Sequence, residues 1–311
     1  MELKYSIDNI TWVAHDVSLV KFEEYREIIQ NNFDCEPYFI ENIGYMFTLF
    51  KKIEVDDTTT EVDEDGEIIL KDGFYRERQL HGQYINGKDI FRMEYNPNVI
   101  SKELVYFIES GLTKELFPVR HMSRMDIALD VFGRDLTYLV LDRPRVKSCR
   151  FMSPTGALEN TYYGMRKSNV FIRIYNKGTE RRQKFLNGKA YEDFSDDIYP
   201  LARKHWWRIE MQVRTRGINE CFTHFEEMLE QMRFLIDENL ENKDIDTIMN
   251  VFAVRDNPWL LGRMTKQRRY KYRKLLKEEF SDDPLKDKAK KLLHEETALF
   301  DYYFDLYPKT D

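Results

Sequence analysis

The stretch Phe171-Ile-Arg-Ile-Tyr-Asn-Lys177 alternates apolar and polar side chains, as a β-strand does. Successive side chains of a strand point to opposite faces, so isoleucines line one face and Arg173, Tyr175 and Lys177 line the other. A phenol ionises near pH ~10, and neighbouring cations favour the nucleophilic phenolate. Two cations would also hold a phosphate group. The pattern therefore indicates a tyrosine that attacks a phosphate ester, although an ordinary amphipathic strand fits these residues as well.

The same alternation recurs in the stretches 91–95, 124–131 and 207–214. Each has one apolar face, which is typical of an antiparallel sheet with one buried side. We therefore predict an α+β fold built on an antiparallel or mixed β-sheet, whose other side gathers the polar residues of these stretches. Those residues are Arg92, Glu94, Arg124, Asp126, Asp130, Arg208, Glu210, Gln212 and Arg214.

Three of these carboxylates, Glu94, Asp126 and Glu210, are candidate ligands for a divalent metal, since Mg²⁺ and Mn²⁺ prefer oxygen donors. Arginine–carboxylate pairs across an open sheet face would produce the same pattern without a metal. No two of the six histidines are close in sequence, which excludes a His-x-His or His-x-x-x-His metal site.

The order of predicted elements divides the chain at about residue 216. Residues 1–216 read as a mixed α+β part, and residues 217–311 read as mainly helical. No glycine-rich phosphate loop follows a strand, so a P-loop or Rossmann nucleotide site is excluded. Besides the stretches above, strands are predicted at 4–17, 44–52, 68–78, 147–152 and 160–166. Helices are predicted at 20–33 (N-cap Ser18), 101–110, 136–141, 218–238, 243–254, 264–280 and 285–306, and a helix entry at 179–182 within the basic stretch 177–184.

Charge is unevenly distributed along the 311 residues, whose formal net charge is −7. Eight residues between Glu54 and Glu67 are acidic, and this stretch reads as a mobile hairpin tip without chemistry. Between Arg263 and Lys277 eight residues are basic and none is acidic. Concentrated basic segments in an acidic protein are compatible with DNA binding at chosen surfaces.

The basic run 263–277 is the predicted DNA-contacting segment. Basic helices bind phosphate backbones and enter the major groove, whereas ordinary exposed helices mix both signs of charge. The candidate residues are Arg263, Lys266, Arg268, Arg269, Lys271, Arg273 and Lys274.

The three widely spaced cysteines, Cys35, Cys149 and Cys221, argue against a disulfide framework and fit a reducing cytoplasm. The sequence shows neither an apolar run long enough to span a bilayer nor a secretory signal, so we expect a cytoplasmic protein without a membrane partner.

The motif at 171–177, preceded by Thr161-Tyr-Tyr-Gly164 and followed by Trp207-Arg-Ile-Glu210, resembles the Rep_trans family. These proteins initiate rolling-circle replication of small plasmids in Gram-positive bacteria and are best known from staphylococcal resistance plasmids. The resemblance extends through Glu94-Tyr-Asn-Pro-Asn98, Met125-Asp-Ile-Ala-Leu-Asp130 and 266–277, in the family's order.

The resemblance implies a sequence-specific DNA nickase that binds the plasmid's double-strand origin. It implies a nicking and joining core at 1–216, a nucleophile at Tyr175, and a divalent metal, Mg²⁺ or Mn²⁺, at Glu94, Asp126 and Glu210, with Asp130 as a weaker fourth position. Gln212 stands where relatives carry a second glutamate. It also implies origin discrimination by the basic run, a homodimer, and recruitment of a host superfamily 1 helicase.

Other interpretations stay open at the level of sequence. A relaxase of a conjugative element shares the chemistry, a DNA-binding regulator would not cut, and a metal-dependent hydrolase would leave a free 5′-phosphate. Tyr162 and Tyr163 are rival nucleophiles on a neighbouring predicted strand.

Overall fold

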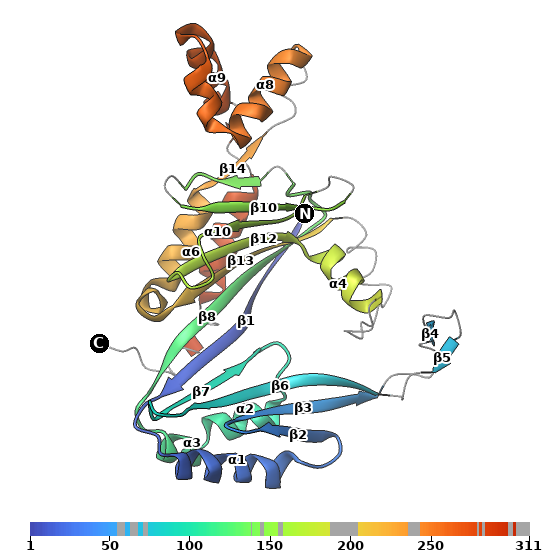
Figure 1. Cartoon of the computed structure of the whole chain (residues 1–311), viewed down its shortest axis with the longest axis vertical. Coiled ribbons are helices and arrows are strands. Elements are labelled where there is room, and N and C mark those ends of the chain that lie inside the picture. Colours follow the sequence, from blue (N-terminus) through green and yellow to red (C-terminus); the bar gives the residue numbers. More distant parts are fainter. Residues whose placement is uncertain are drawn as a thin grey trace.

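The computed structural model describes residues 1–54, 60–62, 68–70, 74–137, 139–143, 146–154, 158–186, 205–235, 243–278, 280–281, 284–297 and 301–302. Within this part of the chain, ten strands form one antiparallel sheet in the order β10-β11-β12-β13-β8-β1-β7-β6-β3-β2 (Figure 1). Helices pack beside it, and the predicted α+β class is confirmed. The strands are β1 (Glu2–Ala14), β2 (Tyr38–Ile43), β3 (Met46–Glu54), β6 (Phe74–Ile85), β7 (Ile90–Tyr95), β8 (Arg120–Phe132), β10 (Ser148–Met152), β11 (Leu158–Tyr163), β12 (Val170–Asn176) and β13 (Trp206–Arg214).

The long strands β1 and β8 run through the middle of the sheet and join its two halves (Figure 1). Their pairing contains two irregularities, one at Asp8 in β1 and one at Ser123 in β8. An extra residue in one strand reverses the alternation beyond it. Ile7 and Ile10 of β1 consequently both lie in the core, although a regular strand would place them on opposite faces.

Two groups of helices cover the apolar face of the sheet. Helices α1 (Leu19–Phe33), α2 (Lys102–Glu109) and α3 (Gly111–Leu116) lie along the half that contains β6, β3 and β2 (Figure 1). Helix α1 begins after Ser18, whose side chain accepts a hydrogen bond from the Lys21 amide, as predicted. Its aromatic residues pack on β7 through Phe91, which lies 5.5 Å from Phe22 and 5.7 Å from Tyr25 between ring centroids.

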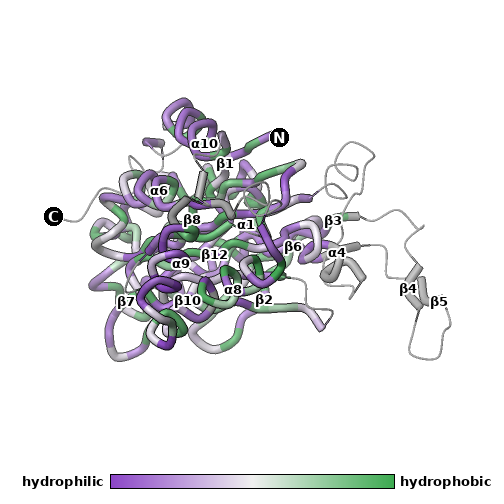
Figure 2. Tube along the Cα trace, turned by 90° about the horizontal axis from the view of Figure 1, so that it is seen from above, coloured by the Kyte–Doolittle hydropathy of each residue, from purple (hydrophilic) through white to green (hydrophobic). Residues whose placement is uncertain are grey.

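Helices α6 (Cys221–Glu230) and α10 (Pro284–Glu295) cover the other half of this face. Tyr5 of β1 donates its hydroxyl to the carbonyl of Ala289 in α10 and packs edge-on against Phe225 in α6. The predicted boundary at 216 therefore falls between elements that share one hydrophobic core. Figure 2 shows that hydrophobic residues concentrate in strands such as β12, whereas α10 is mostly hydrophilic.

A helical hairpin projects from one end of the molecule (Figure 1). It consists of α8 (Ile245–Asp256), the short 3₁₀ turn η2 (Pro258–Arg263) and α9 (Lys266–Glu278). Val251 and Tyr272 form its own small hydrophobic cluster, separate from the main core. Further elements of the described residues are β4 (Thr60–Val62), β5 (Ile68–Leu70), α4 (Lys177–Leu186), η1 (Thr215–Glu220) and β15 (Phe280–Ser281).

Two predicted helices are wrong in whole or in part. The stretch 136–141 contains strand β9 (Leu139–Leu141) instead of a helix, and the stretch 218–238 continues after α6 into strand β14 (Met232–Leu235). These strands pair with each other, with Phe234 opposite Leu139. Each is a short apolar run, and only its distant partner decides between strand and helix. The predicted strand at 68–78 is two strands, β5 and β6, and β2 was not predicted. Most of the acidic stretch 54–67 lies outside the described residues.

Candidate active site

Tyr175 lies on β12 and points toward the polar face of β13. Its hydroxyl donates a hydrogen bond to Glu210 Oε2 at 3.2 Å, and the tyrosine is only 8% exposed. The pairing of β12 with β13 sets this arrangement, because it places Arg173 opposite Glu210 and Tyr175 opposite Arg208. Residues separated by more than thirty positions in sequence thus share one site on the sheet.

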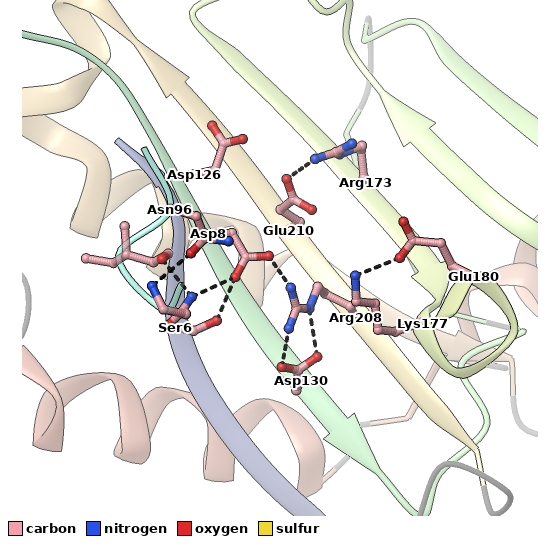
Figure 3. A network of polar contacts seen from close by, with 12 residues as sticks. Ser6, Asp8, Asn96, Asp126, Asp130, Arg173, Lys177, Glu180, Arg208 and Glu210 are labelled. Atoms are coloured by element: carbon pink, nitrogen blue, oxygen red, sulfur yellow. Dashed lines mark hydrogen bonds and ion pairs between the residues drawn. The ribbon is translucent and has the colours of Figure 1, made fainter. Parts of the chain in front are cut away.

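Arg173 and Lys177 approach the same tyrosine from different elements. Arg173 forms an ion pair with Glu210 (Figure 3). Its guanidinium carbon lies 5.9 Å from the centre of the Tyr175 ring. Lys177 does not continue the strand face as predicted, because β12 ends at Asn176 and Lys177 begins α4. Its ammonium lies 5.6 Å from the centre of the Tyr175 ring and 2.7 Å from Glu180 in α4.

The pKa of Tyr175 is raised, which contradicts the expectation that neighbouring cations favour its phenolate. Burial is the largest cause and the Glu210 carboxylate adds to it, while Arg208 and Arg173 oppose the shift without cancelling it. In this arrangement Tyr175 is a neutral phenol whose proton is held on a hydrogen bond to Glu210. Attack by this hydroxyl requires the proton to leave, and Glu210 Oε2 is within reach of it.

The candidate metal ligands are each engaged by arginine. Asp126 on β8 is buried and receives two hydrogen bonds from Arg124, one of them 2.7 Å long. Burial raises the pKa of Asp126 to about 6, and the nearby Glu210 carboxylate contributes, although Arg124 opposes it. Asp126 and Glu210 thus lie close enough to repel each other.

Glu94 lies farther along the sheet, since β1 separates β7 from β8. It pairs with Arg92 at 2.6 Å and Arg78 at 3.5 Å. Burial opposes its ionisation, but Arg92, Arg124 and Arg78 together outweigh burial and lower its pKa.

Within the described residues, no three Asp, Glu, His or Cys side chains converge to hold a metal ion. The carboxylates carry suitable oxygen donors, yet each is already neutralised by an arginine. Asp126 and Glu210 lie near each other, whereas β1 separates Glu94 from both, and the metal requirement stays a prediction.

Asp8 is a site residue that sequence reasoning missed. It sits at the irregularity of β1, and its carboxylate forms an ion pair with Arg208 (Figure 3). Burial raises its pKa, and Glu210 is one of the charges that act on it. The signal in the sequence was the polar pair Asp8-Asn9 inside an otherwise alternating strand, which is typical of a β-bulge.

Arg208 lies between two carboxylates, Asp8 and Asp130 (Figure 3). Its guanidinium donates to both oxygens of Asp130, at 2.7 and 2.5 Å, and the Trp206 indole donates to the same carboxylate at 2.8 Å. Asp130 is therefore saturated by its protein partners, which does not suit the weaker fourth metal position given to it. Gln212 of β13, which is directly opposite Asp126 of β8, donates to the carbonyl of Arg166 at 3.1 Å.

The two rival tyrosines lie on β11. The Tyr163 hydroxyl accepts a hydrogen bond from the Leu141 amide at 3.0 Å, and burial raises its pKa. This tyrosine fastens β11 to the short strand β9. Tyr162 lies opposite Arg173 and packs against Phe151, with 4.9 Å between ring centroids, so it shares the polar face with the candidate site.

The predicted DNA-contacting residues all belong to the projecting hairpin, but two of them also support its structure. Arg269 donates to the carbonyls of Leu261 and Met264, at 2.8 and 3.3 Å, and thereby closes η2 onto α9. Lys271 donates to the Thr247 hydroxyl of α8 at 3.1 Å. The exposed members of the set are Arg263, Lys266, Arg268, Lys271, Arg273 and Lys274.

Comparison with known proteins identifies relatives of one kind. The chain is 26% identical over 191 residues to a replication initiation protein of Staphylococcus aureus, covering 60% of this chain and 55% of the relative. A second protein of the same description and organism is 27% identical over 208 residues, covering 66% and 59%.

The chain is similar to staphylococcal replication initiation proteins. This similarity confirms the resemblance predicted from the sequence motifs, and the chain spans little more than half the length of these relatives. No family model matches the chain. Among solved structures, a rolling-circle replication initiator from Geobacillus stearothermophilus covers 76% of this chain and 88% of its own, with 12% identity and a TM-score of 0.39. No helix among the described residues is both long and apolar enough to cross a membrane.

Proposed function

We propose that this protein initiates rolling-circle replication of a plasmid by binding the plasmid's double-strand origin and nicking one strand. The observation that carries the proposal is the hydrogen bond from the Tyr175 hydroxyl to Glu210, in a chain similar to replication initiation proteins. Tyrosine is a nucleophile that keeps a cut strand attached to the enzyme.

The proposed step exchanges one phosphodiester for another. Tyr175 Oη bonds to the phosphorus as the bond from phosphorus to the 3′-oxygen breaks, which leaves a 5′-phosphotyrosine and a 3′-hydroxyl that primes synthesis. The phenol proton passes to Glu210 Oε2, and the departing 3′-oxygen takes up a proton from water. Because the ester bond is conserved, the reverse exchange closes the strand without ATP.

The neighbouring cations have separate parts in this proposal. Arg173 holds the Glu210 carboxylate in position and, with Lys177, offsets the negative charge that develops on the phosphate. The requirement for Mg²⁺ or Mn²⁺ stays a prediction, and no step is assigned to a metal, because every predicted ligand has an arginine partner.

Three partners complete the proposal. Origin DNA binds the exposed cations of the α8–α9 hairpin, a second copy of the chain supplies the tyrosine that helps to terminate the reaction, and a host superfamily 1 helicase unwinds the duplex. The dimer and the helicase rest on the family resemblance.

The test is incubation of the purified chain with supercoiled plasmid that carries its origin, with Mg²⁺, with Mn²⁺ and with EDTA. We expect nicked circles that retain protein on a denaturing gel. Tyr175→Phe should reduce nicking by roughly 10³-fold or more while origin binding stays unchanged.

Tyr162→Phe serves as the matched control, since this tyrosine shares the polar face. Nicking that survives Tyr175→Phe but not Tyr162→Phe would move the nucleophile to Tyr162. Nicking that leaves a free 5′-phosphate and no adduct would indicate a hydrolase, and origin binding without any nicking would indicate a regulator. A substrate at a transfer origin instead of a replication origin would indicate a relaxase.

A further inference from the structure

An aromatic pair lies on the open face of the sheet, far from Tyr175. Phe39 of β2 and Phe50 of β3 are directly opposite each other and stack with 5.2 Å between ring centroids and 12° between planes. On β3 the core residues Phe47 and Leu49 point to the helix-covered side, so Phe50 points to the other side. This pair is half-buried and does not belong to the hydrophobic core.

Two exposed arginines of β6 flank the aromatic pair. The Arg76 guanidinium lies 4.5 Å from the centre of the Phe39 ring, and Arg78 is directly opposite Phe50. Both arginine side chains are 54% exposed, and their ion pairs, with Glu41 at 3.4 Å and Glu94 at 3.5 Å, are long. Aromatic rings with arginines beside them on an open antiparallel sheet suit nucleic-acid bases and their phosphates.

A second feature of the same face is a pair of like charges. Arg214 of β13 and Arg124 of β8 are directly opposite each other, an arrangement that destabilises a sheet unless an anion lies between the two side chains. Arg214 Nε is buried and has no hydrogen-bond partner in the described part of the chain. Burial lowers the pKa of Arg214, and repulsion from Arg124 and Arg92 lowers it further. Asp126, which pairs with Arg124, and Glu94 oppose this shift. The unpartnered Nε of Arg214 is therefore the group that a DNA phosphate would engage.

The aromatic pair and the arginine pair are connected across the sheet. Phe50 is directly opposite Arg78, and Arg78 forms an ion pair with Glu94. Glu94 in turn interacts with Arg124, which is directly opposite Arg214. From Phe39 to Tyr175 the path crosses seven strand spacings, roughly 34 Å in a flat sheet.

We propose that this face binds single-stranded DNA, with bases stacked at Phe39 and Phe50 and a phosphate held between Arg124 and Arg214. The proposal deepens the proposed function and rests on it in one respect: the bound strand is taken to be the one that Tyr175 cuts. A single strand is favoured over a duplex because only unpaired bases expose their faces to aromatic side chains.

The first test measures binding of a fluorescein-labelled oligothymidylate of about 16 nucleotides by fluorescence anisotropy, with the full chain in EDTA. The double variant Phe39→Ala/Phe50→Ala is expected to bind at least about tenfold more weakly. Tyr106→Ala is the matched control, since Tyr106 is an exposed aromatic on α2, which packs on the opposite side of the sheet. Phe39→Tyr/Phe50→Tyr, which keeps both rings, should restore binding.

The second test separates phosphate contact from stacking. Arg214→Ala should lower the slope of log K against log salt by about 0.7, the value for one phosphate of a single strand, whereas the aromatic variant should leave the slope unchanged. Lys102→Ala, on exposed α2, should change neither slope nor affinity. Unchanged oligothymidylate affinity in both the aromatic variant and Arg214→Ala, with circular dichroism showing intact folding, would overturn the proposal.

The measurement of single-strand binding does not depend on whether the protein nicks DNA. Loss of single-strand binding in the aromatic variant, together with wild-type behaviour in Tyr175→Phe, would support the binding face even if no plasmid were cut. Normal nicking with no effect of the aromatic or arginine substitutions on single-strand binding would leave the proposed function intact and remove only this inference.

Discussion

The polar face around Tyr175 and the α8–α9 hairpin both carry concentrated charge, but they hold it differently. Around Tyr175 the charged groups are buried and paired: Arg208 joins Asp8 to Asp130, and Glu210 is held by Arg173. On α9 most cations are exposed to solvent, over a small hydrophobic cluster of their own.

The difference in burial between the two regions indicates which of them suits catalysis and which suits DNA recognition. Buried, fully paired groups on central strands are held in fixed positions, which suits a reaction that needs one hydroxyl in one place. Exposed cations cost little to pair with DNA phosphates and are easily exchanged, which suits recognition. The predictions below test whether these two regions behave as differently as their structures indicate.

The largest effect is expected on removing the central arginine of the buried network. Arg208→Ala leaves Asp8 and Asp130 buried without their partner, so we expect a loss of about 3–5 kcal/mol in the free energy of unfolding. Urea denaturation followed by circular dichroism measures it. The control is Arg268→Ala on α9, which should stay within about 0.5 kcal/mol of the wild type. Equal losses of stability in the two variants would contradict the contrast between the buried network around Arg208 and the exposed cations of α9.

A smaller effect is expected at Arg269, the cation of the hairpin that has structural partners. Its side chain donates to carbonyls of the η2 turn, so Arg269→Ala should destabilise the hairpin by about 1–3 kcal/mol. Hydrogen exchange should report faster exchange of amides in α8 and α9, with the sheet unaffected. The adjacent Arg268→Ala should leave exchange unchanged, and equal exchange in the two variants would contradict a structural role for Arg269.

The exposed cations should affect DNA binding without affecting stability. The double variant Arg268→Ala/Arg273→Ala should bind duplex origin DNA about tenfold more weakly, with a salt slope lower by about 0.9 for each lost phosphate contact. Its melting temperature should match that of the wild type. A double variant that binds the origin normally would remove these two cations of α9 from the DNA interface.

The smallest effect on stability is expected at the beginning of β8, beside Arg120. There His121 stacks on His15 with 5.0 Å between ring centroids, and burial, with His15 adding, lowers the pKa of His121. The native state then binds fewer protons than the unfolded state, so stability falls as pH decreases through about 6.5 and below. His121→Gln should remove this small dependence in urea titrations between pH 5 and 7.5. An identical pH profile in the variant would show that the histidine stack is not responsible.

Features that depend on the local alternation of apolar and polar residues were predicted correctly from the sequence. Strand β7 runs from Ile90 to Tyr95 as expected, because its alternation stops at Asn96-Pro-Asn98. The polar faces of β7, β8, β12 and β13 do share one sheet, and this follows from the same period of two.

What the sequence did not predict depends on distant partners. The insertion of β1 between β7 and β8 separates Glu94 from Asp126, and no local pattern reports which strands are neighbours. The raised pKa of Tyr175 follows from burial and from Glu210, which outweigh Arg208 and the Arg173 that is visible beside it in the sequence. The structural role of Arg269 likewise depends on carbonyl groups outside its own helix.

The most direct test of the central claim is peptide mapping of the protein–DNA adduct. Wild-type protein is incubated with origin plasmid and a divalent cation, digested with nuclease and trypsin, and analysed by mass spectrometry for the modified peptide. The account predicts a nucleotide 5′-phosphate on Tyr175 and no adduct in Tyr175→Phe. An adduct on another residue, or cleaved DNA with no attached peptide, would contradict it.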